Sequence, residues 1–305
     1  MVVADSRIQK DKTLHLIITD SGLGGLSICS EIERNLRQSN PGRDVLLTYF
    51  NAWPEQQGYN DLPDMQSRAD VFNRALTRMA EFEPDHILIA CNTLSILYSR
   101  TEYSRRSAAV PVLGIIEAGV DLFCEALSAD PSSSIVMLGT RTTIQSHVHQ
   151  DRLVQKGIRR ERISAVACHG LAAAIETDPD SPDVAGLIEK CLTEACSADL
   201  SGTRLYAGLC CTHYTYVKDL MRSSLERHFG RRVQILDPNQ RMADDVAPRT
   251  EKPHPEPVHS MIRVRVISKV ELDEKKRRAV AKRLEPVSEA TAQALLSYNR
   301  DPGLF

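Results

Sequence analysis

Short apolar runs alternate along the chain with longer stretches in which apolar residues return every three or four positions. The first pattern is typical of buried strands and the second of amphipathic helices. This alternation predicts an α/β fold with right-handed crossovers, a mostly parallel sheet, and ligands beyond the carboxyl ends of the strands. We expect strands at residues 14–19, 44–50, 86–90, 111–115, 135–138, 162–167, 203–207, 233–236 and 261–268. We expect helices at residues 25–38, 65–82, 144–155, 183–195 and 216–228.

Two segments of the chain show a weak internal similarity. Residues 87–93 and 205–213 each read as a strand followed by a cysteine and a small hydroxyl residue. We therefore expect two similar doubly wound, mostly parallel α/β domains that face each other across a cleft, each presenting one cysteine. The first domain is expected to comprise residues 14–113 and 225–305, and the second residues 114–224.

A proline-rich segment precedes a C-terminal element. Residues 248–257 contain four prolines with charged residues and a histidine, which is typical of an exposed linker. After the strand at 261–268, helices are expected at 272–284 and 289–298. The basic run from Lys275 to Arg283 is interpreted as a solvated helix face, with a binding patch as the alternative.

Length and charge narrow the class of partner. A chain of 305 residues that is 42% hydrophobic can bury one large core or two ordinary ones. Its 38 lysines and arginines against 40 acidic residues create no field that would attract nucleic acid or a membrane, so we expect small-molecule partners. No segment has the apolar length of a signal peptide core or a membrane span, and we expect a soluble, cytoplasmic protein.

The chain has eight cysteines, which is not the density of a small disulfide scaffold. A reducing compartment would keep them as thiols. Four of them lie in segments whose pattern predicts a helix, and we expect these to be small buried hydrophobic residues: Cys29, Cys124, Cys191 and Cys196.

A glycine-rich turn follows the first strand. Residues 19–27 run from a strand through Gly22 and Gly24 into a helix, and helix amides beside glycine suit an anion or a carboxylate. A dinucleotide site is the alternative. Against it, Ser27 stands where the third small residue belongs, Asn51 stands near where an acidic residue should hold the ribose, and Asp20 would repel a phosphate.

Cys91 lies where a buried strand meets the helix that begins near Leu94. The helix dipole and nearby amides should favour its thiolate. A buried inert cysteine is the alternative, and the polar pair Asn92 and Thr93 argues against it.

A second cysteine, Cys211, follows another apolar strand and lies two residues from His213. The imidazole can take a proton from the thiol or stabilise its thiolate. A zinc site is the rival interpretation, because cysteine and histidine are zinc ligands. Cys210, Cys211 and His213 would provide part of the ligand set, and Cys168 and His169 could complete it.

These segments, taken together, resemble the glutamate racemase branch of the aspartate/glutamate racemase family. The resemblance covers about residues 14–246. The matching segments are Asp20-Ser21-Gly22-x-Gly24-Gly25-Leu26, Ala90-Cys91-Asn92-Thr93, Gly114-Ile-Ile116-Glu117-Ala-Gly119, Gly139-Thr140-x-x-Thr143-Ile144-x-Ser146 and Cys211-Thr212-His213-Tyr214.

The resemblance implies a racemase of an acidic amino acid that uses no cofactor and no metal. One cysteine, Cys91 or Cys211, removes the Cα proton while the other delivers a proton to the opposite face. It further implies that Asp20 assists Cys91 and that His213 assists Cys211. The expected substrate-binding residues are Ser21, Asn92, Thr93, Thr140, Thr143, Thr212, Tyr59 and Glu176.

The chain departs from the family in its specificity segment. The family's Pro-Tyr-Gly turn is replaced by a longer stretch at residues 51–60, of which only Tyr59 clearly matches. Glutamate is therefore the first substrate to test and aspartate the second. The alternatives are a cysteine-dependent isomerase or lyase of a small dicarboxylate and a non-catalytic carboxylate-binding relative. The resemblance also implies D-glutamate supply for cell walls and admits a homodimer.

Overall fold

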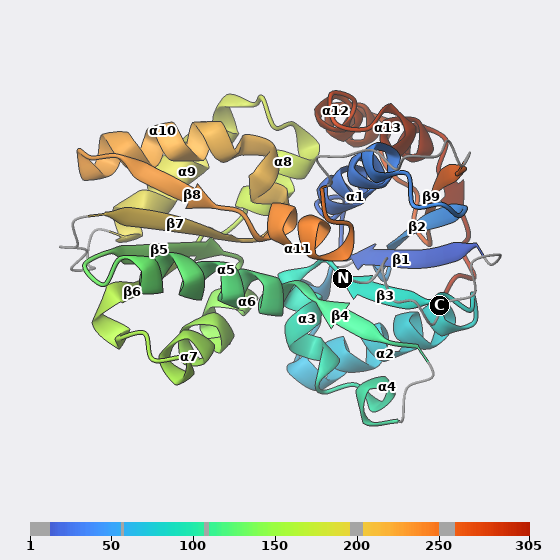
Figure 1. Ribbon diagram of the computed structural model, residues 1–305, viewed down its shortest axis with the longest axis horizontal. Coiled ribbons are helices and arrows are strands. Elements are labelled where there is room, and N and C mark those ends of the chain that lie inside the picture. Colours follow the sequence, from blue (N-terminus) through green and yellow to red (C-terminus); the bar gives the residue numbers. More distant parts are fainter. Residues whose placement is uncertain (1–12, 56–57, 107–109, 196–203, 250–259) are drawn as a thin grey trace.

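Two separate parallel sheets form the framework of the protein (Figure 1). The computed structural model describes residues 13–55, 58–106, 110–195, 204–249 and 260–305. The first sheet has the order β10-β9-β2-β1-β3-β4 and the second the order β6-β5-β7-β8. All pairings are parallel, which confirms the predicted doubly wound α/β class.

The first sheet comprises β1 (Leu14–Asp20), β2 (Val45–Asn51), β3 (His86–Ile89), β4 (Val112–Gly114), β9 (Ile262–Ser268) and β10 (Asn299–Arg300). Its central strand is apolar on both faces. Leu16 and Ile18 enter one core, whereas Ile17 enters the core on the opposite face. A strand buried on both sides reads as a continuous apolar run, which is why the sequence predicted it.

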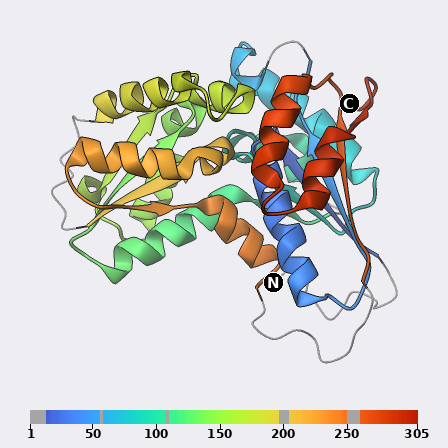
Figure 2. The same cartoon turned by 90° about the horizontal axis from the view of Figure 1, so that it is seen from above.

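Helices cover both faces of this sheet (Figure 2). On one face lie α1 (Leu26–Ser39), α11 (Pro238–Val246), α12 (Glu274–Leu284) and α13 (Glu289–Leu296). On the other face lie α2 (Met65–Ala80), α3 (Asn92–Tyr98) and α4 (Glu102–Arg105). A short 3-10 helix, η1 (Tyr59–Asp61), precedes α2.

The second sheet comprises β5 (Ser134–Gly139), β6 (Ile163–Ala167), β7 (Leu205–Cys210) and β8 (Val233–Leu236). One face packs against α8 (Leu171–Thr177), α9 (Pro182–Ala195) and α10 (Lys218–Phe229). The other packs against α5 (Ile115–Ala129) and α7 (Val148–Gln155). The remaining short helices are α6 (Arg141–Gln145), η2 (Arg160–Arg162) and η3 (Thr212–Val217).

Two sequence expectations about elements need correction. The helix expected over residues 144–155 is interrupted, because His147 adopts a left-handed conformation with φ 56° between α6 and α7. Residues 225–236 were assigned to the first domain, yet β8 pairs in register with β7 of the second sheet. The chain returns to the first sheet through α11, whose buried residues join its core. The wider domain division stays a prediction.

The expectation that the cysteines are thiols is wrong for two of them. Cys168 follows β6 and Cys191 lies on α9, and the two form a disulfide with Cα atoms 5.1 Å apart. Cys29 is buried as expected, whereas Cys124 is half-buried. Cys196 and most of the proline-rich stretch lie outside the described residues. Within the described ranges, none of the helices combines the length and apolar character needed to cross a membrane.

Candidate active site

A cavity of about 530 Å³ lies where the carboxyl ends of the two sheets approach each other. Strand ends from both sheets contribute to its wall, as parallel sheets lead one to expect. The structure brings all the candidate residues to this one cavity: Asp20, Ser21, Tyr59, Cys91, Asn92, Thr93, Thr140, Thr143, Glu176, Cys211, Thr212 and His213.

Cys91 lies just after β3, at the position that precedes the first residue of α3. Its Sγ is 3.3 Å from Ser21 Oγ, which in turn lies 3.5 Å from Asp20 Oδ1. Thiol, hydroxyl and carboxylate thus form a short connected series in a buried corner of the cavity. Such a series offers a proton on Cys91 a nearby acceptor.

Burial opposes the Cys91 thiolate more strongly than the amide at the helix start favours it. Burial, and after it the charge of Asp20, raises the pKa of the thiol. Hydrogen bonds from Ser21 and the Leu94 amide lower it, but they do not compensate. A helix of one to two turns provides too little positive potential to offset a desolvated thiol beside a carboxylate.

Cys211 lies at the end of β7 and precedes η3. Its Sγ is 3.9 Å from His213 Nδ1, and His213 Nε2 is 2.8 Å from Glu176 Oε2. The sulfur, the imidazole and the carboxylate follow one another in a line. This arrangement matches the general pattern of a nucleophile or acid–base group, its base, and a residue that orients the base.

The imidazole in this line favours its charged form. Burial lowers the pKa of His213, but the hydrogen bonds and charges of Cys211 and Glu176 raise it well above its usual value. For Glu176 burial raises the pKa of the carboxyl, and the hydrogen bond and charge of His213 bring it below its usual value. The Leu23 amide and the Lys276 ammonium lower it further.

The glycine-rich turn carries a carboxylate, as its sequence suggested, but the carboxylate belongs to the protein. The Leu23 amide donates to Glu176 Oε2 at 2.8 Å. A Cβ atom on Gly22 would lie 2.5 Å from the same oxygen. A Cβ on Gly24 would collide with the Thr212 hydroxyl and lie 2.8 Å from the His213 amide nitrogen. The glycines therefore permit the turn to approach the opposite wall closely.

Several donors face the cavity. Thr140 Oγ1 lies 3.2 Å from Thr93 Oγ1 and 3.0 Å from Thr143 Oγ1. Hydroxyls from the two lobes, that is, from the parts of the chain built on the first and the second sheet, thus form one row. The Asn92 amide is buried, and neither of its polar atoms has a partner among the described residues. The Tyr59 hydroxyl is likewise buried with no partner in that part of the chain. Buried polar groups of this kind are normally satisfied by a ligand or water.

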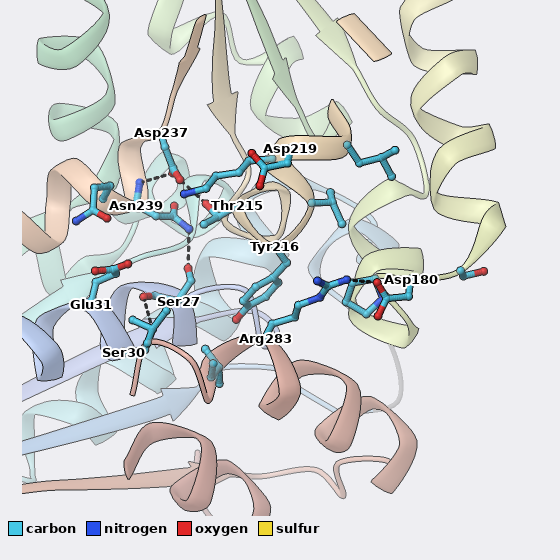
Figure 3. A pocket seen from close by; sticks show the side chains of 18 of the residues that line it. Ser27, Ser30, Glu31, Asp180, Thr215, Tyr216, Asp219, Asp237, Asn239 and Arg283 are labelled. Carbon is cyan, nitrogen blue, oxygen red and sulfur yellow. Dashed lines mark hydrogen bonds and ion pairs between the residues drawn. The ribbon is translucent and has the colours of Figure 1, made fainter. Parts of the chain in front are cut away.

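Sequence reasoning missed several residues that shape this cavity. Tyr49, which is buried, donates to Gly22 O at 2.6 Å, and Tyr216, which is half-buried, donates to Leu23 O at 2.9 Å, so two tyrosine hydroxyls hold the turn. Behind the turn, Asn239 donates to Ser27 Oγ and to the Thr212 carbonyl, in the wall of a second cavity (Figure 3). The sequence around these residues is apolar or has a helical pattern, and neither pattern predicts such contacts.

Three cationic side chains, Arg68, Arg141 and Lys276, also line the active-site cavity without having been predicted there. Lys276 comes from α12, and Arg68 from α2 donates to Leu62 O at 3.0 Å and Thr142 Oγ1 at 3.4 Å. On the helix face of residues 275–283, which was interpreted as solvated, Lys276 is 40% exposed but also lines the cavity. Among the residues that the structure describes, there is no group of three or more histidine, cysteine or acidic side chains that could hold a metal.

Comparison with known proteins points to one family. The sequence model described as Asp/Glu/Hydantoin racemase matches residues 17–246. A glutamate racemase from Fusobacterium nucleatum is 29% identical over 234 residues, which cover 75% of this chain and 78% of that protein. One from Staphylococcus aureus is 26% identical over 234 residues, covering 75% and 79%.

Solved structures share the fold. The glutamate racemase isoform RacE1 from Bacillus anthracis superimposes with a TM-score of 0.62 at 18% identity, covering 95% of this chain and 96% of that one. The glutamate racemase from Francisella tularensis, solved in complex with D-glutamate, gives a TM-score of 0.60 at 20% identity, covering 89% and 94%.

Proposed function

The chain belongs to the Asp/Glu/Hydantoin racemase family, and from that premise we propose that it racemises an acidic amino acid, glutamate first and aspartate second, with two cysteine thiols. The observation that carries the proposal is that Cys91 and Cys211, from different sheets, line the same cavity. Each has its own proton partner, Asp20 through Ser21 on one side and His213 on the other.

The proposed reaction transfers two protons. One sulfur, as the thiolate, takes the Cα proton, and the electron pair of the broken C–H bond moves into the substrate carboxylate. The other sulfur, as the thiol, then gives its proton to the opposite face of Cα. The enzyme is left with the two sulfurs in exchanged protonation states, ready for the reverse direction. Each positioned acid or base contributes roughly 10²–10⁴-fold.

Neutral donors stabilise the negative charge that develops on the carboxylate. Asn92 and the row formed by Thr93, Thr140 and Thr143 provide amide and hydroxyl groups from both lobes. Preorganised donors in a closed site act strongly on developing charge. We assign Tyr59 to the side-chain end of the substrate, because its hydroxyl lies in the cavity wall where the family's specificity turn would be and none of the described residues bonds to it. A homodimer stays a prediction.

Exchange of the Cα proton in heavy water tests the proposal. The wild type should introduce deuterium at Cα of L-glutamate and D-glutamate and convert each into the other, measured by NMR and chiral chromatography. Cys91→Ser and Cys211→Ser should each reduce conversion by at least about a hundredfold. Cys124→Ser, on α5 outside the cavity, is the matched control and should leave turnover unchanged.

The same experiment separates the alternatives. Absence of exchange with every acidic amino acid, in a folded and reduced sample, would contradict a racemase. A covalent adduct on one cysteine with an unsaturated or keto dicarboxylate would favour an isomerase or lyase instead. Tight binding of a dicarboxylate without exchange would favour a non-catalytic relative.

A further inference from the structure

The C-terminal helix α12 contributes a residue to the active-site cavity. The family match ends at residue 246, and α12 begins at Glu274. Lys276, in the first turn of this helix, lines the cavity, and its Nζ lies 3.9 Å from Glu176 Oε1. A helix that lies beyond the part of the chain matched by the family model therefore reaches the line formed by Cys211, His213 and Glu176.

The two oxygens of Glu176 have separate partners. Oε2 accepts from the Leu23 amide at 2.8 Å and contacts His213 Nε2 at the same distance. Oε1 faces Lys276. The Glu176 side chain is 16% exposed, so it is shielded from most solvent counterions. Hydrogen bonds therefore hold this carboxylate at Oε2, while the Lys276 ammonium faces Oε1 as an ion pair beyond hydrogen-bond distance.

A second contact anchors α12 over the same segment. Asp180, four residues beyond Glu176, pairs with Lys282 at 3.4 Å and with Arg283. Figure 3 shows Arg283 and Asp180 directed toward each other at the edge of the second cavity. The helix that presents Lys276 is thus tied to the loop that follows α8, the helix carrying Glu176.

We infer that Lys276 is a positioning residue that holds the Glu176 carboxylate against His213 and so supports the thiolate of Cys211. When Cys211 carries the thiolate that the proposed reaction requires, the charges alternate along the series: ammonium, carboxylate, imidazolium, thiolate. Without the ammonium the remaining buried series carries a net negative charge, and it retains a proton on sulfur more readily. The inference rests on the proposed function for the role of Cys211, but its test does not require turnover.

Thiol alkylation tests the inference. Iodoacetamide is added to the folded protein at pH 7, and the labelling rates of Cys91 and Cys211 are followed separately by peptide mass spectrometry. Lys276→Met retains the length of the side chain and removes its charge. It should slow labelling of Cys211 roughly two- to fivefold, the range for a partly exposed ion pair, and leave that of Cys91 unchanged. Lys276→Arg should restore the rate.

Lys275→Met is the matched control, because Lys275 is the exposed neighbour on the same helix and lies outside the cavity. It should label like the wild type. An unchanged Cys211 rate in Lys276→Met, or equal changes at both cysteines, would overturn the inference. If the wild type catalysed no Cα exchange, the proposed function would fail while the labelling comparison would still be decisive for Lys276.

Discussion

Thr212 donates a 2.8 Å hydrogen bond to Asp20 across 192 residues of sequence, and this bond joins the two sides of the candidate active site. Thr212 is the neighbour of Cys211, whereas Asp20 reaches Cys91 through Ser21. The bond therefore fixes one carboxylate oxygen of Asp20, the residue proposed to assist Cys91. The donor, Thr212, is the neighbour of the other cysteine, Cys211. The orientation of Asp20 depends on both lobes being in place.

Thr212→Val tests this dependence. The substitution preserves the shape of the side chain and removes the donor, so a buried carboxylate oxygen loses its partner. A hydrogen bond to a charged group contributes about 1.5–3 kcal/mol, which predicts a decrease in kcat of about tenfold or more. Thr193→Val is the control and should retain full kcat, because Thr193 is an exposed threonine on α9 that donates to the Glu189 carbonyl of its own helix. Equal kcat values for the two variants would contradict the proposed role of Asp20.

The approach of the glycine turn gives a second prediction. A Cβ atom on Gly24 meets the Thr212 hydroxyl and the backbone of His213, which cannot move aside as a flexible side chain could. Gly24→Ala should therefore reduce kcat strongly and lower the melting temperature. Gly186→Ala, within α9 and with no atom within 4 Å of the new Cβ, should stabilise the protein or leave it unchanged. A fully active Gly24→Ala enzyme would show that the two walls separate during turnover.

The sequence predicted those parts of the site that depend on local pattern. Buried parallel strands are continuous apolar runs, so the strand ends that carry Asp20, Cys91 and Cys211 were expected where the structure has them. The spacing of Cys211 and His213 likewise placed two partners in one turn. Contacts between functional residues that are close in sequence could therefore be predicted.

Contacts between distant segments were not readable. Lys276 meets Glu176 through the packing of α12 on α8, and nothing in the periodicity of either helix encodes that meeting. The raised pKa of the Cys91 thiol depends on burial and on Asp20, a residue from another strand. His147 has no sequence signal for a left-handed conformation, so the break between α6 and α7 was also missed.

The stability of the fold should fall in mild acid because of His149. Burial, with the charge of Arg152, lowers the pKa of this imidazole to about 4. In the unfolded chain it titrates near ~6.5, so unfolding takes up a proton as the pH falls from about 6.5 to about 4. A lowered folded-state pKa means that this stability is present above pH 6.5 and is lost below it. The contribution of His149 to the free energy of unfolding therefore falls by about 2 kcal/mol between pH 7 and pH 5.

Urea unfolding of the wild type and His149→Phe measures this contribution. Phe retains an aromatic ring beside Phe123 and does not titrate. The wild type should lose about 2 kcal/mol more than the variant between pH 7 and pH 5. His147→Asn, at an exposed position whose left-handed backbone suits asparagine, should behave like the wild type. Parallel losses in the wild type and His149→Phe would assign the acid sensitivity to other groups.

Tyr59 should reveal a conflict between stability and substrate binding. Its hydroxyl is buried in the cavity wall, and none of the described residues bonds to it. Leaving such a group unpaired costs about 1–3 kcal/mol, so Tyr59→Phe should raise the melting temperature of the free enzyme. If the hydroxyl binds the side-chain carboxylate of the substrate, the same substitution should raise KM with a smaller effect on kcat.

Tyr103→Phe is the control that separates these effects. The Tyr103 hydroxyl is also buried and finds no partner in the described part of the chain, but it does not line the active-site cavity. This variant should gain melting temperature and keep the KM of the wild type. A raised KM in Tyr59→Phe alone would place the substrate side chain at η1, where the family's specificity turn is replaced. Unchanged KM in both variants would move the side-chain site elsewhere in the cavity, with Arg68 as the next residue to replace.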